Sequence, residues 1–213
     1  MKTFIFANGD APNLPILMDL VNPGDLLIAA DAGVRHIRDI GAIPSAVIGD
    51  LDSIAETDRN WIDQNHVKTL RYPPVKDETD LELCLNHALM ANPSEIIITA
   101  CYGGRLDQML GIVSLLLDPR LELIPTRLDD GVTEIMLVHK DLKLSGQVGD
   151  TVSLIPWGGD VSDVRTKGLE YPLAGEALFA HRSRGVSNRM LENSASIQCG
   201  SGHLLCVHIR QNA

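Results

Sequence analysis

The pattern of apolar residues along the chain changes at the polar turn Leu128-Asp129-Asp130-Gly131. Before this turn, short apolar runs alternate with stretches of helical periodicity, which is typical of βαβ units and a mainly parallel sheet. After it, Gly and Pro separate short segments of alternating polarity, which favours an all-β sandwich or partial barrel. The pattern predicts an α/β domain over residues 1–130 and an all-β sandwich domain over residues 131–213.

The same pattern predicts the main elements. In the first domain, strands are expected at residues 3–7, 26–30, 46–48, 68–72 and 95–100. One helix should follow Thr79, which has capping-box spacing to Glu82, and another should follow Gly104 and pack on the sheet. The apolar residues with helical spacing after Gly104 are Leu106, Met109, Leu110, Val113 and Leu117. In the second domain, strands are expected at residues 134–139, 142–144, 151–155, 177–180, 194–198 and 204–209.

The acidic excess of the chain lies in the first domain. The net charge is -10, and residues 1–130 contain 10 Lys and Arg against 20 Asp and Glu, whereas residues 131–213 contain 8 of each class. Nucleic acid needs a basic surface, so no nucleic-acid partner is expected, although a bound divalent cation can reverse the local sign of an acidic site. The expected partner is a cation or a metal-bridged anion.

The location expected from the sequence is the cytoplasm. No apolar run approaches the roughly 18–20 residues that span a bilayer, and the first residues lack the basic region and apolar core of a signal peptide. No membrane partner is expected. The four cysteines contain no CxxC pair and are expected to be reduced structural thiols.

Aspartates recur where the strands of the first domain should end. They are Asp10, Asp31, Asp50, Asp52, Asp77, Asp80 and Asp107. The carboxyl ends of parallel strands meet at one edge of a sheet, so these side chains should gather there. A single Asp is common in turns and helix caps, but a cluster needs protonation, a basic partner or a hard divalent cation. The series predicts a Mg²⁺ site, because Mg²⁺ combines a few carboxylates with substrate phosphates.

Two segments carry the clearest local signals. In Gly49-Asp50-Leu51-Asp52-Ser53, the Gly permits a tight turn and two carboxylates can reach one ion. In Gly103-Gly104-Arg105, backbone N–H groups at a helix start and an Arg can bind phosphate, although a plain turn with a surface Arg gives the same pattern. The GxxxxGK[ST], GxGxxG, HExxH and GxSxG patterns are absent, so a P-loop, a dinucleotide fold, a zinc protease and a serine hydrolase have no support.

Taken in order, the motifs of this chain resemble those of the thiamine pyrophosphokinase (thiamine diphosphokinase) family. GDxDS, KDxTD and GGRxD in this order are specific, whereas each motif alone is not. The matching segments are Asn8-Gly9, Ala30-Asp31-Ala32-Gly33, Gly49-Asp50-Leu51-Asp52-Ser53, Lys76-Asp77-Glu78-Thr79-Asp80, Gly103-Gly104-Arg105-Leu106-Asp107, Ser153-Leu154-Ile155-Pro156, Thr166-Lys167-Gly168-Leu169-Glu170-Tyr171-Pro172-Leu173 and Gly185-Val186-Ser187-Asn188.

The resemblance implies an α/β catalytic domain that binds nucleotide and metal, and a β-sandwich that binds thiamine and forms a homodimer with active sites at the subunit interface. It also implies the reaction, in which a diphosphoryl group passes from ATP to the hydroxyl of thiamine and gives AMP and thiamine diphosphate. Mg²⁺ is the implied cofactor and ATP the co-substrate. At one place the chain departs from many bacterial members, because Gln108 follows the GGRxD motif where they have His.

The resemblance also implies roles for individual residues. The implied Mg²⁺ ligands are Asp31, Asp50, Asp52 and Asp77, of which Asp50, Asp52 and Asp77 are also the implied catalytic carboxylates. The implied nucleotide-side residues are Asp31, Ser53, Thr79, Asp80, Arg105 and Asp107. Tyr171 would provide an aromatic wall for the thiamine rings, with Ser187 and Asn188 as polar contacts.

Two other functions remain open. One is a related diphosphokinase that acts on another hydroxymethyl heterocycle, such as a pterin; the other is a non-catalytic module that binds thiamine or a nucleotide. Release of AMP separates an enzyme from a binding module. Tyr171, Ser187 and Asn188 are the residues expected to decide the acceptor.

Overall fold

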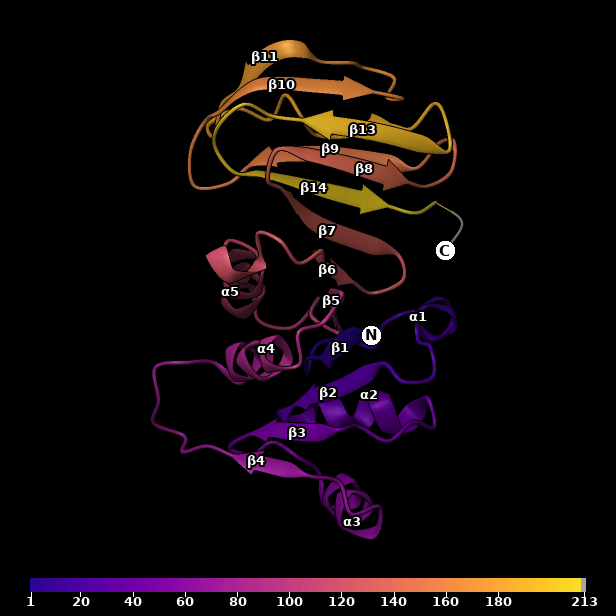
Figure 1. The fold of residues 1–213 in the computed structure, drawn as a ribbon, viewed down its shortest axis with the longest axis vertical. Coiled ribbons are helices and arrows are strands. Elements are labelled where there is room, and N and C mark those ends of the chain that lie inside the picture. Colours follow the sequence, from indigo (N-terminus) through magenta and orange to yellow (C-terminus); the bar gives the residue numbers. More distant parts are fainter. Residues whose placement is uncertain (212–213) are drawn as a thin grey trace. The chain divides into compact units, whose positions relative to one another are not determined.

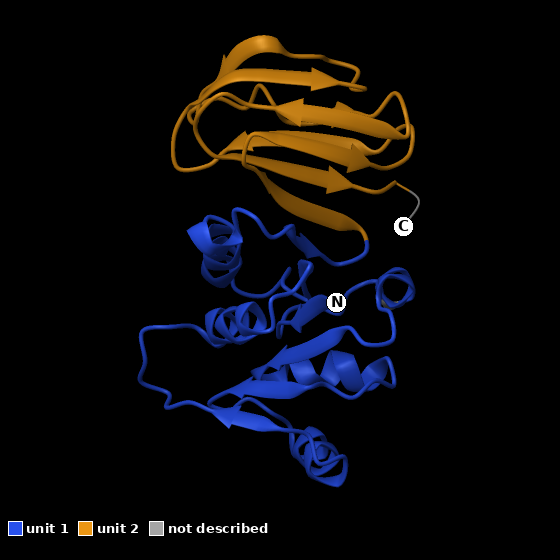
Figure 2. Ribbon diagram, in the orientation of Figure 1, with its two compact units in different colours: residues 1–131 blue, residues 132–213 orange. Residues whose placement is uncertain are grey.

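The computed structural model describes residues 1–211 and forms two compact units, Met1–Gly131 and Val132–Ala213, shown in two colours in Figure 2. Among the described residues, no helix is both long and apolar enough to cross a membrane. The four cysteines, Cys84, Cys101, Cys199 and Cys206, are buried free thiols.

The first unit contains a parallel sheet with the strand order β6-β5-β1-β2-β3-β4 (Figure 1). The strands are β1 (Lys2–Phe6), β2 (Leu26–Ala30), β3 (Ala46–Gly49), β4 (Thr69–Arg71), β5 (Glu95–Thr99) and β6 (Thr126–Asp129). The central strand β1 pairs with both β2 and β5, so that Phe4 faces Leu27 on one side and Ile97 on the other. Apolar runs such as these are buried on both faces of a parallel sheet. The prediction of an α/β domain with a parallel sheet is confirmed.

One part of the chain that was expected to be a turn is a strand. Leu128 and Asp129 belong to β6, which pairs with β5. Asp129 is fully buried, and its carboxylate accepts a 2.9 Å hydrogen bond from the N–H of Gly131 and lies 3.1 Å from Arg127 Nε. Asp and Gly are frequent residues of turns, so the sequence of this segment predicts a turn even though the aspartate is buried and paired in a strand.

Five α-helices and two short 3₁₀ helices accompany the sheet. They are α1 (Leu14–Leu20), η1 (Asp31–Gly33), α2 (Val34–Asp39), α3 (Glu56–Gln64), α4 (Asp80–Met90), α5 (Leu106–Leu115) and η2 (Pro119–Leu121). Helix α4 begins as expected, because the N–H of Glu82 donates a 3.2 Å hydrogen bond to Oγ1 of Thr79. It packs against β1, β2 and β3 through buried residues that include Leu81 and Leu85.

Helix α5 differs from the expectation. Val113 is buried, but Leu106 is 64% exposed and Leu110 is 43% exposed. The prediction that all these residues pack on the sheet was therefore wrong for Leu106 and Leu110. Helix α5 borders the pocket through Met109 and Ile112, whereas Leu106 and Leu110 are not among the pocket-lining residues and lie exposed.

The second unit contains two antiparallel sheets, with the strand orders β12-β9-β14-β7 and β11-β10-β13-β8. The strands are β7 (Thr133–Val138), β8 (Asp141–Ser145), β9 (Thr151–Pro156), β10 (Val161–Lys167), β11 (Ala174–Leu178), β12 (Asn188–Arg189), β13 (Ser194–Gln198) and β14 (Leu204–Ile209). Buried residues from both sheets form one core, for example Leu154 and Leu204 from the first sheet and Val164 and Ile197 from the second. The predicted all-β sandwich is confirmed.

Three elements of the second unit were predicted imperfectly. The two-residue strand β12 was not expected from the sequence. Strand β10 was missed, because irregular pairing with β11 interrupts its alternation. The strand expected at residues 177–180 lies instead at Ala174–Leu178, and Phe179 is 46% exposed.

A network of charged side chains is buried in the second unit. Nδ1 of His208 lies 2.9 Å from Glu134 Oε2, and its Nε2 lies 2.8 Å from Asp150 Oδ2. The side chain of His208 is 1% exposed, and Arg210 pairs with Glu134 at 2.5 Å. Burial alone would lower the pKa of His208, but the hydrogen bonds and charges of Glu134 and Asp150 outweigh burial and raise it.

Candidate active site

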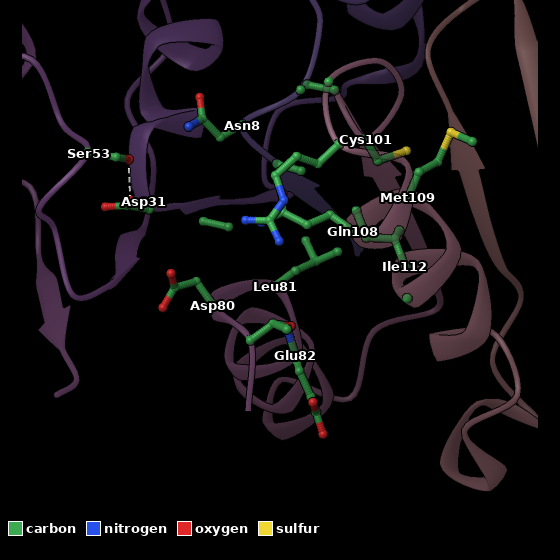
Figure 3. Close-up of a pocket in the computed structure, with 18 of the residues that line it drawn as sticks. Asn8, Asp31, Ser53, Asp80, Leu81, Glu82, Cys101, Gln108, Met109 and Ile112 are labelled. Atoms are coloured by element: carbon green, nitrogen blue, oxygen red, sulfur yellow. Dashed lines mark hydrogen bonds between the residues drawn. The ribbon is translucent and has the colours of Figure 1, made fainter. Parts of the chain in front are cut away.

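A pocket of about 950 Å³ lies at the carboxyl ends of the parallel strands. Its lining comes from the ends of four strands and from the first turns of α4 and α5. The strand-end residues are Ala7–Gly9 after β1, Ala30 and Asp31 at the end of β2, Asp50 and Ser53 after β3, and Ala100, Cys101, Gly103 and Gly104 after β5. Figure 3 shows Asp31, Ser53 and Asp80 on one side and Cys101, Met109 and Ile112 on the other. Ligands of open α/β sheets bind at this edge, so the pocket is the candidate active site.

Three carboxylates form a cluster on the side of the pocket where Asp31, Ser53 and Asp80 lie, which we call the polar side. One oxygen each of Asp31, Asp50 and Asp52 lies within 4.8 Å of the other two. Gly49 packs closely against two carboxylate residues, since a Cβ on Gly49 would lie 3.2 Å from Asp31 Cβ and 3.1 Å from Asp80 Cγ. Asp31 itself has a φ of 49°, a left-handed conformation that only a few residue types adopt readily.

The environment of Asp31 raises its pKa. Burial is the largest cause, the hydroxyl of Ser53 opposes it by donating a hydrogen bond to Oδ2, and the charges of Asp80, Asp50 and Asp52 add to the rise. The other oxygen, Oδ1, is buried and accepts no hydrogen bond. An ionised carboxylate with such an oxygen is unfavourable unless a cation approaches it.

The pKa values of Asp50 and Asp52 are shifted in opposite directions. The backbone N–H of Asp52 donates a 3.0 Å hydrogen bond to Asp50 Oδ1 and lowers the pKa of Asp50. The side-chain hydrogen bond with Asp50, and then its charge, raise the pKa of Asp52. The cluster therefore offers one carboxylate oxygen from each of three aspartates, and Oδ1 of Asp31 is buried without a hydrogen-bond partner, which fits a small divalent cation such as Mg²⁺.

The start of helix α4 lines the polar side of the pocket and lies below Asp31 in Figure 3. Thr79 caps the helix, and Asp80 is its first residue. Nζ of Lys76 lies 3.0 Å from Asp80 Oδ1 and also lines the pocket. Lys76 thus brings a positive charge to the carboxylates.

Two glycine-containing loops form the wall next to α5. The N–H of Gly9 donates a 2.7 Å hydrogen bond to the carbonyl of Ala100, and the N–H of Asp10 donates one of 2.9 Å to the carbonyl of Tyr102. A Cβ on Gly9 would collide with both carbonyl oxygens, and a Cβ on Gly103, where φ is 77°, would collide with the carboxylate of Asp10. Only glycine fits these two positions.

Arg105 and Asp107 lie on the same wall. Arg105 Nη2 is 2.6 Å from Asp107 Oδ2, and both side chains are well exposed, at 70% and 67%. The opposite charges of Arg105 and Asp107 attract each other and hold the guanidinium near the pocket. The N–H groups of Arg105 that do not contact Asp107 face solvent.

The residues predicted for the acceptor come together in the second unit. The side chain of Asn188 accepts a 3.0 Å hydrogen bond from the N–H of Tyr171 and donates one of 2.8 Å to its carbonyl. The N–H of Ser187 donates to Oγ of Ser153 at 3.0 Å. Tyr171 is 65% exposed.

Family models match both units. The model described as "Thiamin pyrophosphokinase, catalytic domain" matches residues 17–128, and the model described as "Thiamin pyrophosphokinase, vitamin B1 binding domain" matches residues 138–204. The chain belongs to the thiamine pyrophosphokinase family. The family resemblance found in the sequence motifs is thereby confirmed.

Named relatives agree with this membership. The chain is 30% identical to thiamine pyrophosphokinase of Bacillus subtilis (strain 168), over 97% of this chain and 98% of that protein. The crystal structure of thiamine pyrophosphokinase from Bacillus subtilis has a TM-score of 0.90 at 27% identity and covers 99% of this chain and 100% of that chain. Yeast thiamin pyrophosphokinase shares the fold, with a TM-score of 0.81 at 19% identity over 98% of this chain and 86% of that chain.

Within this family fold, the structure groups some residues of the motifs and not others. Asp31, Asp50 and Asp52 form the cluster described above. The pocket is also lined by Ser53, Thr79, Asp80, Arg105 and Asp107. Asp77 is exposed on the loop before α4 and is neither in the cluster nor among the pocket-lining residues.

Sequence reasoning gave no role to several residues that line the pocket. Asn8 and Lys76 stand inside matched motifs, so their positions were the available signal. The apolar side, formed by Cys101, Met109 and Ile112, carried no such signal, because apolar residues with helical spacing are usually core residues.

Proposed function

We propose that this protein is a thiamine diphosphokinase, which transfers a diphosphoryl group from ATP to the hydroxyl of thiamine and releases AMP. The observation that carries the proposal is the cluster of Asp31, Asp50 and Asp52 beside the pocket, within a unit that matches the catalytic-domain model of the family. Such a cluster matches the need of phosphoryl transfer for a cation that neutralises the polyphosphate.

In this proposal Asp31, Asp50 and Asp52 hold Mg²⁺, and Ser53 keeps Asp31 in place by its hydrogen bond. When bound, Mg²⁺ supplies charge neutralisation and orientation for the polyphosphate. Asp77 lies outside the cluster, so the proposal gives the metal to the other three carboxylates. Since Asp31 is buried, its ligand atom is preorganised, whereas Asp52 is exposed and can adjust.

The nucleotide occupies the pocket with its polyphosphate at the polar side. The N-terminus of α4, with Thr79 and Asp80, and the loop at Gly103 and Gly104 offer backbone N–H groups, and Arg105, held by Asp107, offers a guanidinium. The apolar side at Cys101, Met109 and Ile112 suits the flat faces of the base.

The reaction needs an in-line attack. The hydroxyl oxygen of thiamine forms a bond to the β-phosphorus, the bond from that phosphorus to the oxygen bridging to the α-phosphate breaks, and AMP leaves with the bridging oxygen. The proton of the hydroxyl passes to a carboxylate of the pocket. Arg105 and the helix N-terminus stabilise the charge that develops on the phosphate oxygens.

The second unit provides the acceptor site in this proposal. The exposed ring of Tyr171 can attract the cationic thiazolium ring of thiamine, and Asn188 fixes the backbone that carries Tyr171. Ser187 adds a polar contact. The match to the vitamin B1 binding domain supports this assignment.

A homodimer and a cytoplasmic location complete the proposal. The family resemblance of the motifs supports the homodimer. The buried free thiols of Cys84, Cys101, Cys199 and Cys206 suit a reducing compartment.

The test is to incubate the purified protein with ATP, Mg²⁺ and thiamine and to measure AMP and thiamine diphosphate together. Equal amounts of both products, abolished by EDTA and absent without thiamine, are expected. Asp50→Asn should lower the rate by about 100-fold or more, because it weakens the metal site. The matched control is Asp63→Asn, an exposed aspartate of α3, which should keep the activity.

Two results would contradict the proposal. Equal turnover of a pterin alcohol would support the related diphosphokinase instead. Binding of ATP and thiamine without any AMP would support a binding module.

A further inference from the structure

Lys76 is a cation set among the carboxylates of the pocket. Its side chain is 12% exposed, and Nζ lies 3.0 Å from Asp80 Oδ1 and 3.3 Å from the backbone carbonyl of Pro73. Its charge also reaches the cluster: the pKa of Asp50 is lowered first by the N–H of Asp52 and additionally by the charge of Lys76. Lys76 therefore compensates part of the negative charge at the polar side.

The contact between Lys76 and Asp80 is loose. Oδ1 of Asp80 is buried and accepts no hydrogen bond, although the ammonium is 3.0 Å away, so the two groups attract each other without an aligned hydrogen bond. A lysine carries its ammonium on a flexible four-carbon stem with three donors, so Nζ can change partner without movement of the backbone.

A bound polyphosphate changes the balance of charge around Lys76. ATP with one Mg²⁺ still carries net negative charge, and it would lie against Asp31, Asp50 and Asp80. The cation on the other wall, Arg105, is 70% exposed and engaged with Asp107. Mg²⁺ held by the carboxylate cluster would neutralise part of the polyphosphate, and the ammonium of Lys76, which lies beside Asp80, would be within reach of the same phosphates.

Resting on the function proposed above, we propose that Lys76 contacts the β- or γ-phosphate of the donor nucleotide. In the ligand-free pocket the ammonium pairs with Asp80, and in the complex it turns to the polyphosphate. It moves no proton and forms no covalent bond. Its contribution is binding energy and neutralisation of the diphosphoryl group.

The experiment is calorimetric titration of the full-length protein with ATP plus Mg²⁺, ADP plus Mg²⁺, and AMP. Lys76→Gln should weaken binding of ATP and ADP about 10- to 100-fold, the loss expected for one hydrogen bond between charged groups. AMP lacks the β- and γ-phosphates, so its affinity should stay within about twofold of the wild type. AMP binding also shows that the variant is folded.

Two further variants complete the design. Lys76→Arg keeps the charge and should recover most of the affinity for ATP. Lys68→Gln, an exposed lysine outside the pocket, is the matched control and should bind all three nucleotides normally.

Two outcomes would overturn the role of Lys76. One is unchanged affinity of Lys76→Gln for ATP; the other is an equal loss of affinity for ATP, ADP and AMP, which would mean that Lys76 only shapes the pocket. If the wild type makes no thiamine diphosphate but Lys76→Gln still loses ATP and ADP selectively, the proposed reaction fails and the role of Lys76 stands.

Discussion

Asp150→Asn should destabilise the second unit strongly, because the Asp150 carboxylate accepts three hydrogen bonds inside the domain. Oδ2 accepts from the N–H of Gln147 at 2.8 Å and lies 2.8 Å from His208 Nε2, and Oδ1 accepts from the N–H of Gln211 at 3.0 Å. An Asn side chain has one oxygen and one NH₂ group, so at least one of these donors would face another donor.

The size of the effect follows from these contacts. A hydrogen bond to a charged group contributes about 1.5–3 kcal/mol, and removing one partner of a buried ion pair costs about 3–5 kcal/mol. Since the amide can retain two contacts in weaker form, we expect a loss of about 3 kcal/mol. For a chain of this length, unfolding in one transition, the melting temperature should fall by about 6–12 °C.

The loss should depend on pH in a defined direction. Because the pKa of His208 is raised on folding, its contribution is complete below its ordinary value of 6.5 and disappears as the pH rises through the raised pKa. Burial alone would raise the pKa of Asp150, but hydrogen bonds, led by the N–H of Gln147, lower it from 3.8, so its contribution disappears only as the pH falls through that lowered value. The network is therefore strongest between these two ordinary values.

Urea unfolding followed by circular dichroism at about pH 6 and about pH 9 measures this difference. The control is Asp141→Asn, an exposed aspartate of β8, which should change stability by less than about 0.5 kcal/mol. A loss below about 1 kcal/mol for Asp150→Asn at pH 6, or a loss that grows at pH 9, would refute the ion-pair explanation.

Three further predictions concern the two candidate sites. Ser53→Ala should weaken Mg²⁺ binding about tenfold, measured by the Mg²⁺ dependence of the rate, because Asp31 loses the hydrogen bond that the Ser53 hydroxyl donates to it. Ser45→Ala, outside the pocket, should have no effect. Gly103→Ala should lower the free energy of unfolding by about 1–2 kcal/mol in urea, because its φ of 77° is left-handed and the exposed side chain of Asp10 must move away from the new Cβ; unchanged stability would contradict a left-handed backbone at this position. Asn188→Ala should raise KM for thiamine about tenfold and leave KM for ATP unchanged, as it releases the backbone of Tyr171; an equal change in both constants would argue against an acceptor site there.

Much of this architecture was predictable, because it depends on periodic apolar runs. Strand β2 was expected at residues 26–30 and spans Leu26–Ala30, and β14 was expected at residues 204–209 and spans Leu204–Ile209. The cap at Thr79 was predictable for the same reason, since it depends on local spacing. Elements whose pairing is irregular, such as β10, lose this periodicity and were missed.

The site was predictable only to the level of motifs. The rule that parallel strands end at one edge brought Asp31 and Asp50 together in advance, and the structure groups them with Asp52. The rule says nothing about the path of a loop, so it could not separate Asp77, which is exposed, from its neighbours Lys76 and Asp80, which line the pocket. The direction of a side chain on an irregular loop depends on tertiary contacts.

The contact between Gly9 and the carbonyls of Ala100 and Tyr102 has a mechanical consequence. The N–H of Gly9 donates to the carbonyl of Ala100 and the N–H of Asp10 donates to that of Tyr102, so the two loops that form this wall of the pocket cannot separate without loss of both backbone hydrogen bonds. The segment at residues 72–79 has no helix or strand, and most of its side chains are exposed. If the pocket changes width when a ligand binds, we expect residues 72–79, which include Lys76, to move. The wall formed by the two hydrogen-bonded loops should stay in place.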